Sequence, residues 1–278
     1  MAKKPRVLEF DEIGMWSQVK LSILDEYAKP YNEIILRKGL HPIYIDAFAG
    51  AGHHVVKGSG ERVKGSPVRA LEVQPPFEFF HFVDMDNARA DELNRLSAGR
   101  KNVKIHQGDA NVILLRDVFP CVRYDQYRRG LCILDPYGLD LDWAVIKAAA
   151  TSKAIEIFLN FPVMDMNRNV FWHDHEKVGA VQLERMTRFW GDDSWRTAVY
   201  SCEGYLFGYP EKNSNDVIAE AFRKRLKEVA GFQCVPPPVP MRNSKGATVY
   251  YLFFAAQQPV AASIVTDIFE KYQHAGEQ

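Results

Sequence analysis

The chain has 278 residues, of which 47% are hydrophobic and 25% charged, a composition typical of one large globular domain with elaborations. Its 35 basic and 35 acidic residues cancel, so any nucleic acid would have to bind through a local basic patch. No run of about 18 apolar residues occurs, and the charged N-terminus has no apolar segment behind it, which excludes a membrane-spanning helix and a signal peptide.

We expect residues 1–14 to form a loose arm that precedes a helix. From Trp16 to Tyr31 the apolar residues recur at helical spacing, and we expect Pro30 to bend or end this helix. Trp16, Tyr27 and Tyr31 are typical of core residues on the apolar stripe, and a cradle for a stacked base is the alternative.

Five predicted strands alternate with four helices in the region that follows, which indicates a mostly parallel sheet with helices on both faces. The strands are 42–46, 77–84, 103–106, 131–135 and 154–161. The helices are 66–73, 87–98, 111–118 and 141–150. Ser66 is the expected N-cap of the first helix, and Pro67 follows it in the first turn.

The C-terminal third has a different character. We expect helices at 170–190, 216–229 and 260–272, and a hairpin made by 232–240 and 248–256. The hairpin would close the sheet with an antiparallel edge, and its proline-rich first strand suits the edge position. The predicted organisation is an N-terminal arm and helix (1–40), a Rossmann-like core (41–162), a helical insertion (163–231), and a closing hairpin and helix of the core domain (232–278).

The first strand ends in the sequence IYIDAFAGAG (43–52). Ligands of parallel sheets bind beyond the carboxyl ends of the strands, and glycines there let the backbone approach a ligand closely. The spacing fits neither the dinucleotide fingerprint G-x-G-x-x-G nor a P-loop. The remaining common ligand is S-adenosylmethionine, and we expect its aminoacyl end to be lined by Asp46, Phe48, Gly50 and Gly52.

Three later motifs each follow a predicted strand. Asp84 or Asp86, in FVDMD, would accept hydrogen bonds from both ribose hydroxyls. Asp109 in GDAN would reach the adenine amino group, and Ala110 would offer its backbone. LDPYG (134–138) would lie beside the methyl group. Each motif alone is also typical of a structural turn, but their order favours a class I methyltransferase-type sheet.

The Asp135-Pro136-Tyr137-Gly sequence resembles the Asp-Pro-Phe-Gly variant of the motif of amino-methyltransferases. An exocyclic base amine is a poor nucleophile, and hydrogen bonds to the Asp135 carboxylate and the Pro136 carbonyl would orient its lone pair. Tyr137 would stack on the substrate. The alternative is a simple turn after a strand. Asn160 would bond the substrate or the Asp135 loop, or would form a strand-ending turn.

An N-terminal helix with Lys20 and the segments YIDAFAGAG, KGSPVRAL, FVDMD, GDAN, LDPYG and LNFP together resemble the three-Cys-motif partner protein family, TcmP. The resemblance spans roughly residues 15–162, and it implies a methyltransferase-like fold, S-adenosylmethionine as cofactor and a partner with a three-cysteine, iron–sulfur-type motif. Tyr137 departs from the Asp-Pro-Phe-Gly pattern but keeps an aromatic ring. This chain's own cysteines form no such motif, and we expect reduced thiols in a cytoplasmic protein: Cys121, Cys132, Cys202 and Cys234.

Residues 53–65 are rich in glycine and charge, which predicts a loop inserted after the first strand. His53 and His54 there would contact a substrate or phosphate, and solvated histidines are the alternative. The cations of the same segment suit either a lid over an anionic substrate or a solvated loop: Lys57, Arg62 and Lys64.

Two other segments carry clustered polar residues. His173, His175 and Glu176 lie in a predicted helix, where their spacing does not suit a metal, so we predict no metal site. Residues 122–130 interleave arginine and tyrosine, which suits RNA contact by ion pairing and stacking. Residues 222–228 alternate cations with acids and suit the solvated face of a helix.

The leading hypothesis is therefore an S-adenosylmethionine-dependent N-methyltransferase that acts on an exocyclic amine of a nucleobase in RNA or DNA. A second hypothesis is a non-catalytic or regulatory subunit that serves an iron–sulfur-type partner. A third is a hydrolase or nuclease with Asp46, Asp84 and Asp135 around a metal ion.

Overall fold

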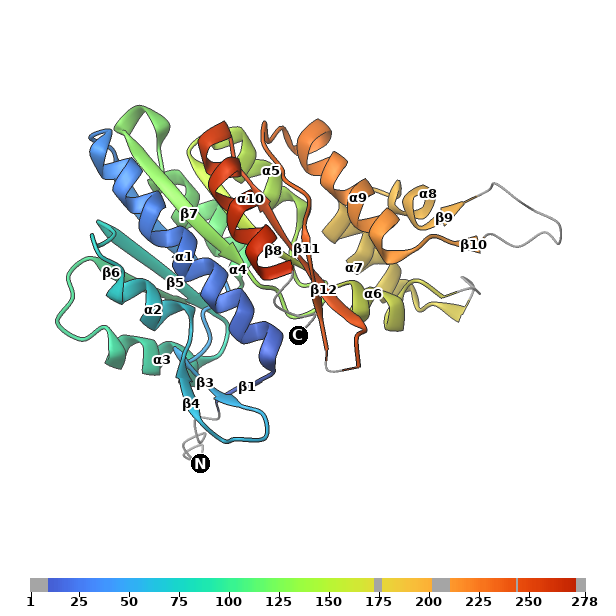
Figure 1. Ribbon diagram of the computed structural model, residues 1–278, viewed down its shortest axis with the longest axis horizontal. Coiled ribbons are helices and arrows are strands. Elements are labelled where there is room, and N and C mark those ends of the chain that lie inside the picture. Colours follow the sequence, from blue (N-terminus) through green and yellow to red (C-terminus); the bar gives the residue numbers. More distant parts are fainter. Residues whose placement is uncertain (1–9, 173–176, 202–210, 244, 274–278) are drawn as a thin grey trace. The chain divides into compact units, whose positions relative to one another are not determined.

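A seven-stranded sheet is the centre of the computed structural model, which describes residues 10–172, 177–201, 211–243 and 245–273 (Figure 1). The strand order is β11-β12-β8-β7-β2-β5-β6. β2 pairs in parallel with β5 and β7, and β12 pairs antiparallel with β8 and β11. The predicted α/β class with an antiparallel edge hairpin is confirmed. The strands are β2 (His41–Asp46), β5 (Phe79–Asp84), β6 (Val103–Gln107), β7 (Arg128–Leu134), β8 (Ile155–Phe161), β11 (Val239–Arg242) and β12 (Thr248–Ala255).

The chain forms two compact units. Unit 1 comprises residues 1–134 and 154–156, and unit 2 comprises residues 135–153 and 157–278. The helices of unit 1 are α1 (Met15–Arg37), α2 (Ser66–Glu72), α3 (Asn87–Leu96) and α4 (Ala110–Ile113), and α4 continues as a π turn over Leu114–Val118. Those of unit 2 are α5 (Trp143–Ser152), α6 (Val163–Asn169), α7 (Ala180–Trp190), α8 (Trp195–Val199), α9 (Asn215–Arg225) and α10 (Pro259–Gln273), and α9 continues as a π turn over Leu226–Ala230.

Helix α1 continues through Pro30, so the expectation that this proline ends the helix is wrong. A proline in a helix interior costs about 3 kcal/mol. The turn after it buries Tyr31 and Ile35, and each such burial stabilises the fold by about 1.5–3 kcal/mol. Packing therefore outweighs the lost hydrogen bond. Tyr27 and Tyr31 are core residues, as predicted.

A half-buried carboxyl group, that of Glu156, lies under α1. The hydroxyl of Tyr27 donates a hydrogen bond of 2.5 Å to Oε2 of Glu156. Burial raises the pKa of Glu156 to about 7, and the Tyr27 hydrogen bond and the charge of Lys38 only partly oppose this shift. This helix–strand contact within unit 1 therefore contains a group that titrates near neutral pH.

A histidine pair lies between β5 and β6. Nδ1 of His81 is 3.0 Å from Nε2 of His106, and both side chains are buried. Burial, the His106 ring and the charges of Lys104 and Arg128 lower the pKa of His81 to about 3. The pair is therefore neutral and hydrogen-bonded at neutral pH.

Residues 53–65 are not the predicted loop. They form strands β3 (His53–Val56) and β4 (Arg62–Lys64), which pair antiparallel, and β1 (Glu12–Ile13) adds to β3 in parallel. The end of the predicted N-terminal arm is thus part of a small sheet. Gly65, rather than Ser66, is the N-cap of α2.

Unit 2 has an aromatic core, in which the ring of Phe222 packs against Phe161, Phe189 and Phe253. The predicted hairpin is present, but only the end of the segment 232–240 lies in β11, and Cys234 forms an isolated bridge to Ala256. The short hairpin of β9 (Tyr200–Ser201) and β10 (Glu211–Lys212) lies beside α8.

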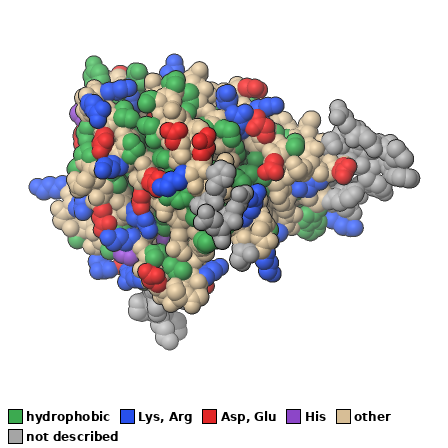
Figure 2. All heavy atoms as spheres, in the orientation of Figure 1, with side chains coloured by type: hydrophobic (Ala, Val, Ile, Leu, Met, Phe, Trp, Pro, Cys, Tyr) green, Lys and Arg blue, Asp and Glu red, His purple; other side chains and the backbone are tan. Residues whose placement is uncertain are grey.

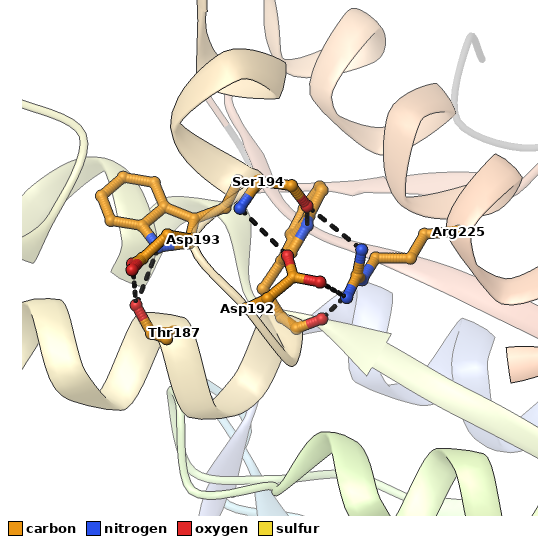
Figure 3. A network of polar contacts seen from close by, with 7 residues as sticks. Thr187, Asp192, Asp193, Ser194 and Arg225 are labelled. Atoms are coloured by element: carbon orange, nitrogen blue, oxygen red, sulfur yellow. Dashed lines mark hydrogen bonds and ion pairs between the residues drawn. The ribbon is translucent and has the colours of Figure 1, made fainter. Parts of the chain in front are cut away.

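We predicted that residues 222–228 lie on the solvated face of a helix. This prediction is wrong for Arg225, whose side chain is only 9% exposed. Its guanidinium donates to the carbonyl of Trp190, the hydroxyl of Ser194 and the carboxylate of Asp192 (Figure 3). The charge also lies 4.7 Å from the ring centroid of Trp143. Arg225 is buried because these groups satisfy its donors, and it joins α9 to the turn after α7.

Candidate functional site

The segment after β2 lies between the ends of two other unit 1 strands. Asp46 ends β2 and is almost fully buried, and its Oδ1 accepts a hydrogen bond of 3.4 Å from the N–H of Phe48. The N–H of Ala47 donates to the carbonyl of Ile133 in β7, and that of Ala49 donates to the carbonyl of Val83 in β5. The path of this segment is therefore set by backbone hydrogen bonds on both sides.

The two glycines of this segment have different physical roles. Both adopt positive φ, +65° at Gly50 and +76° at Gly52. A Cβ on Gly52 would lie 2.7 Å from Cδ1 of Leu96, so any larger residue there would force the Leu96 side chain to move. A Cβ on Gly50 would meet no atom within 4 Å. The side of Gly50 on which a side chain would lie therefore borders open space, which leaves room for a ligand to approach the turn.

Asp84 joins two parts of this sheet edge. Its Oδ2 accepts a hydrogen bond of 2.8 Å from the N–H of Gly50, and its Oδ1 accepts one of 2.8 Å from the N–H of Asp86. Burial raises the pKa of Asp84, while these two N–H groups and the charge of Arg89 lower it. We did not predict this positioning role from the sequence, because the role depends on β5 lying next to β2 in the sheet.

Asp86 and Asp109 both serve as helix N-caps. Oδ1 of Asp86 accepts from the N–H groups of Ala88 and Arg89 at the start of α3. Oδ1 of Asp109 accepts from the N–H of Asn111 at the start of α4. Ala110, the first residue of α4, is buried. Such caps place both carboxylates at helix N-termini, where negative charge is favoured.

An apolar residue that we did not predict lies between the two acids of FVDMD. Met85 is 68% exposed, whereas Asp84 is buried. The exposure of Met85 could have been predicted from the sequence, because side chains alternate between the two faces of a strand. The residue that follows the buried Asp84 therefore points outward. The edge therefore offers apolar as well as charged contacts.

Two predicted catalytic residues meet in unit 2. The side-chain amide of Asn160, at the end of β8, donates a hydrogen bond to Oδ1 of Asp135. Asn160 is only 8% exposed, and its own Oδ1 is buried with no hydrogen-bond donor in the part of the chain that the structure describes. Of the roles considered for Asn160, namely a bond to the substrate, a bond to the Asp135 loop or a strand-ending turn, the structure shows the contact with the Asp135 loop. The Asp135 carboxylate is therefore held in one orientation.

The rest of the DPYG loop is held by unit 2 helices. Gly138 has φ +60°, and a Cβ on it would lie 2.8 Å from Oδ2 of Asp165 in α6. Asp140 and Asp142 form ion pairs of 2.7 Å with Arg185 and Arg188, which lie on α7. The loop is thus tied to α7 on one side and closely packed on α6. Pro136 is buried and Tyr137 is 56% exposed, so the aromatic ring is accessible in unit 2.

The basic residues of the β3–β4 hairpin have neighbours within unit 1. Lys64 forms an ion pair of 2.7 Å with Glu72, and the guanidinium of Arg62 lies 4.3 Å from the ring centroid of Phe10. His53 is half-buried, and burial together with Arg62 and Lys64 lowers its pKa.

Three other features bear on the alternatives. His173, His175 and Glu176 lie outside the described residues. Within the described ranges no cluster of three or more His, Cys, Asp or Glu side chains is arranged to hold a metal ion. Over the same ranges no helix is long and apolar enough to span a membrane. Cys121 and Cys132 are free thiols, and Cys202 lies outside the described residues.

Comparisons with known proteins support the fold. No protein-family model matches the chain, and no curated protein matches it. Protein LPL1258 of Legionella pneumophila, from family DUF519, superposes with a TM-score of 0.56 at 11% identity, over 94% of this chain and 92% of that one. This likeness establishes a shared fold and nothing about activity.

Two other similar structures were solved as methyltransferase-type proteins. A SAM-dependent methyltransferase of Leishmania major has a TM-score of 0.40 at 11% identity, over 84% of this chain and 72% of that chain. TYW2 of M. jannaschii, solved with AdoMet, has a TM-score of 0.34 at 10% identity, over 87% and 76%. Both TM-scores are too low to support an argument. The sheet itself, in which antiparallel β12 lies between β8 and β11, is of the Rossmann-like type that the sequence predicts.

Proposed function

We propose that the protein is an S-adenosylmethionine-dependent methyltransferase that transfers a methyl group to an exocyclic amine of a nucleobase. The observation that carries this proposal is the turn at Gly50, which is fixed by Asp84 and has open space on its side-chain side at the carboxyl edge of the unit 1 sheet. Ligands of such sheets bind at this edge.

The residues of this edge fit S-adenosylmethionine. The segment from Asp46 to Gly52 would hold the aminoacyl end, where the open side of Gly50 leaves room for it. The ribose hydroxyls would donate to Asp84 or Asp86, and Asp109 would accept from the adenine amino group. Ala110 opens α4, where backbone N–H groups have no partner inside the helix. The bound cofactor would supply a sulfonium methyl group to the acceptor.

The acceptor amine would be oriented by residues of unit 2. The Asp135 carboxylate would accept one of its N–H groups, and the carbonyl of Pro136 would accept the other, which directs the nitrogen lone pair away from both. Asn160 is a positioning residue, because it donates to the Asp135 carboxylate and fixes its plane. The exposed ring of Tyr137 would stack on the base. Orientation of this kind contributes several kcal/mol to catalysis, up to about 7–11 in favourable systems.

Calorimetric titration with S-adenosylmethionine tests the cofactor site. We expect saturable binding that Asp84→Asn weakens strongly and Asp91→Asn, on the exposed face of α3, leaves unchanged. No binding at millimolar cofactor would contradict the proposal and favour the non-catalytic subunit instead.

Methyl-group labelling tests the acceptor. Purified protein is incubated with labelled S-adenosylmethionine and total cellular RNA or DNA, and we expect label in a nucleobase amine. Label only in protein, or none despite cofactor binding, would contradict a nucleobase acceptor.

We further propose membership in the TcmP family, on the motif order from the Lys20 helix to LNFP. Co-purification with a protein that carries a three-cysteine motif, and a change in labelling when it is added, would support this assignment. Equal labelling without any such partner would argue against it.

A further inference from the structure

We propose that the amino-terminal edge of the unit 1 sheet binds the phosphate backbone of a single-stranded nucleic acid. This edge, the basic edge, is formed by the four segments that lead into β2, β5, β6 and β7: residues 37–41, 75–79, 97–104 and 121–129. It lies at the other end of the strands from Asp46 and Asp84. The inference deepens the proposed function, and it rests on a nucleobase being the acceptor.

The basic edge concentrates positive charge in a chain whose overall charge is zero. Its only acids are Glu78, which is hydrogen-bonded to Nδ1 of His41 at 2.5 Å, and Asp125, which forms an ion pair of 2.5 Å with Arg123. Across the described part of the chain, Arg123 is the only one of the eight cations of this edge with such a carboxylate partner. The eight are Arg37, Lys38, Arg100, Lys101, Lys104, Arg123, Arg128 and Arg129.

The cations come from different strands but share one region. Arg128 in β7 lies opposite His41 in β2, and Lys104 in β6 lies opposite His81 in β5. The strand registers align Lys104 with His81 and, through Ile45, with Cys132. Arg128 precedes Cys132 by four residues in β7, so Lys104 and Arg128 lie on the same side of the sheet. In Figure 1 the end of α1 and the start of β7 lie at the upper left, and Figure 2 shows lysine and arginine side chains over this part of the surface.

Two arginines of the edge are held in place by backbone carbonyls. Nη1 of Arg128 donates a hydrogen bond of 2.8 Å to the carbonyl of Cys121. Nη1 of Arg129 donates a hydrogen bond of 2.7 Å to the carbonyl of Arg128. A guanidinium bonded only to neutral carbonyls keeps its full charge available for a phosphate. Fixing the side chain in advance also lowers the entropy cost of binding.

The same segment presents two aromatic rings. Tyr124 is 53% exposed, with the Arg129 guanidinium 3.9 Å from its ring centroid, and Tyr127 is 63% exposed. Tyr127 has φ +60°, a conformation that non-glycine residues adopt rarely. Exposed rings beside arginines stack on unpaired bases, which a duplex does not offer. The edge therefore fits a single strand rather than a duplex.

Charge at the opposite edge supports this placement. Asp84, Asp86 and Asp109 lie at the carboxyl ends of the strands or just beyond them and would repel phosphates. A nucleic acid whose base is the acceptor thus needs its backbone held elsewhere on the protein. The basic edge is suited to that contact.

Fluorescence anisotropy with a labelled single-stranded oligouridylate of about 20 nucleotides, without S-adenosylmethionine, tests the inference. We expect the triple variant Arg100→Glu, Lys101→Glu, Lys104→Glu to bind at least ten-fold more weakly. Its salt dependence, as log Kd against log salt, should be shallower by about 2, since each phosphate contact contributes about 0.7. The matched control is Lys224→Glu, Lys227→Glu, Lys245→Glu, at exposed positions of unit 2 with the same change of charge.

A second variant tests the strand preference. Tyr127→Asn suits the left-handed backbone, and we expect it to weaken single-strand binding several-fold while leaving duplex binding unchanged. Wild-type affinity in the Arg100 triple variant, or equal weakening in its control, overturns the inference. Tighter binding of a duplex of equal length overturns the single-strand assignment. Because cofactor is absent, these results stand apart from any failure of methyl transfer, and circular dichroism confirms that each variant is folded.

Discussion

The carboxylate of Asp84 holds the backbone of Gly50 by a hydrogen bond of 2.8 Å between residues 34 positions apart. Its second oxygen holds the N–H of Asp86. One side chain therefore sets both the segment after β2 and the turn after β5. Because both belong to the candidate cofactor site, its geometry depends on this single carboxylate.

Replacement of Asp84 by Asn should disturb both segments. The amide has one acceptor oxygen, so one of the two N–H groups loses its partner, which costs about 1–3 kcal/mol. We expect the free energy of unfolding in urea to fall by about that amount, and affinity for S-adenosylmethionine to fall at least ten-fold. Asp91→Asn is the control. Undiminished affinity in Asp84→Asn would remove Asp84 from the cofactor site.

Alanine at Gly50 and at Gly52 should have opposite signatures. Both variants place a Cβ on a left-handed residue, which costs about 1–2 kcal/mol. Gly52→Ala also clashes with Leu96, so its melting temperature should fall further. Gly50→Ala meets no protein atom and should lose cofactor affinity more than stability. Thermal melts and calorimetric titration compare the two, and equal affinity in Gly50→Ala and wild type would show that no ligand contacts this turn.

Loss of the Asp135 carboxylate should separate chemistry from cofactor binding. We expect Asp135→Ala to abolish methyl transfer while affinity for S-adenosylmethionine stays within a few-fold. A matching loss of cofactor affinity would instead place Asp135 in the cofactor site.

Asn160→Asp tests the positioning role of Asn160. Two carboxylates in contact raise one another's pKa, so the acidic limb of the pH–rate profile should move to higher pH. If the pH–rate profile does not shift and only the free energy of unfolding falls, Asn160 has a structural role and does not position Asp135.

The histidine pair predicts acid sensitivity. The unfolded chain binds a proton at His81 near pH 6.5, whereas the folded protein does so only near pH 3. The contribution of His81 to stability is therefore complete above pH 6.5 and is lost as pH falls between these values, at about 1.4 kcal/mol for each pH unit. Between pH 7.5 and 5, urea denaturation should show that the wild type loses about 2 kcal/mol relative to His81→Phe, a comparison in which the opposite effect of Glu156 is common to both proteins. An equal loss in His81→Phe would assign the effect elsewhere, and His41→Gln at an exposed position is the control.

The sheet and its motifs were predictable because strand runs and turn residues are local patterns. The FVDMD and GDAN motifs predicted where two strands end. They did not predict the contact between Asp84 and Gly50, because that contact requires β5 to pair with β2. The hairpin at 53–65 was not predicted, because its many glycine and charged residues are more typical of a loop than of strands. The burial of Arg225 depends on Asp192, 33 residues away, and no local pattern reports such a pairing.

The Tyr27–Glu156 contact couples folding to proton uptake. The folded carboxyl keeps its proton to about pH 7, whereas the unfolded one releases it near 4.5, so this group lowers stability as pH rises across that interval. Near pH 6.5 the folded chain withdraws part of a proton from the buffer at this position. The calorimetric heat of unfolding should accordingly differ between phosphate and imidazole buffers by an amount that Glu156→Gln changes. The measured heat of unfolding of this protein thus depends on which buffer is used, and not only on the pH.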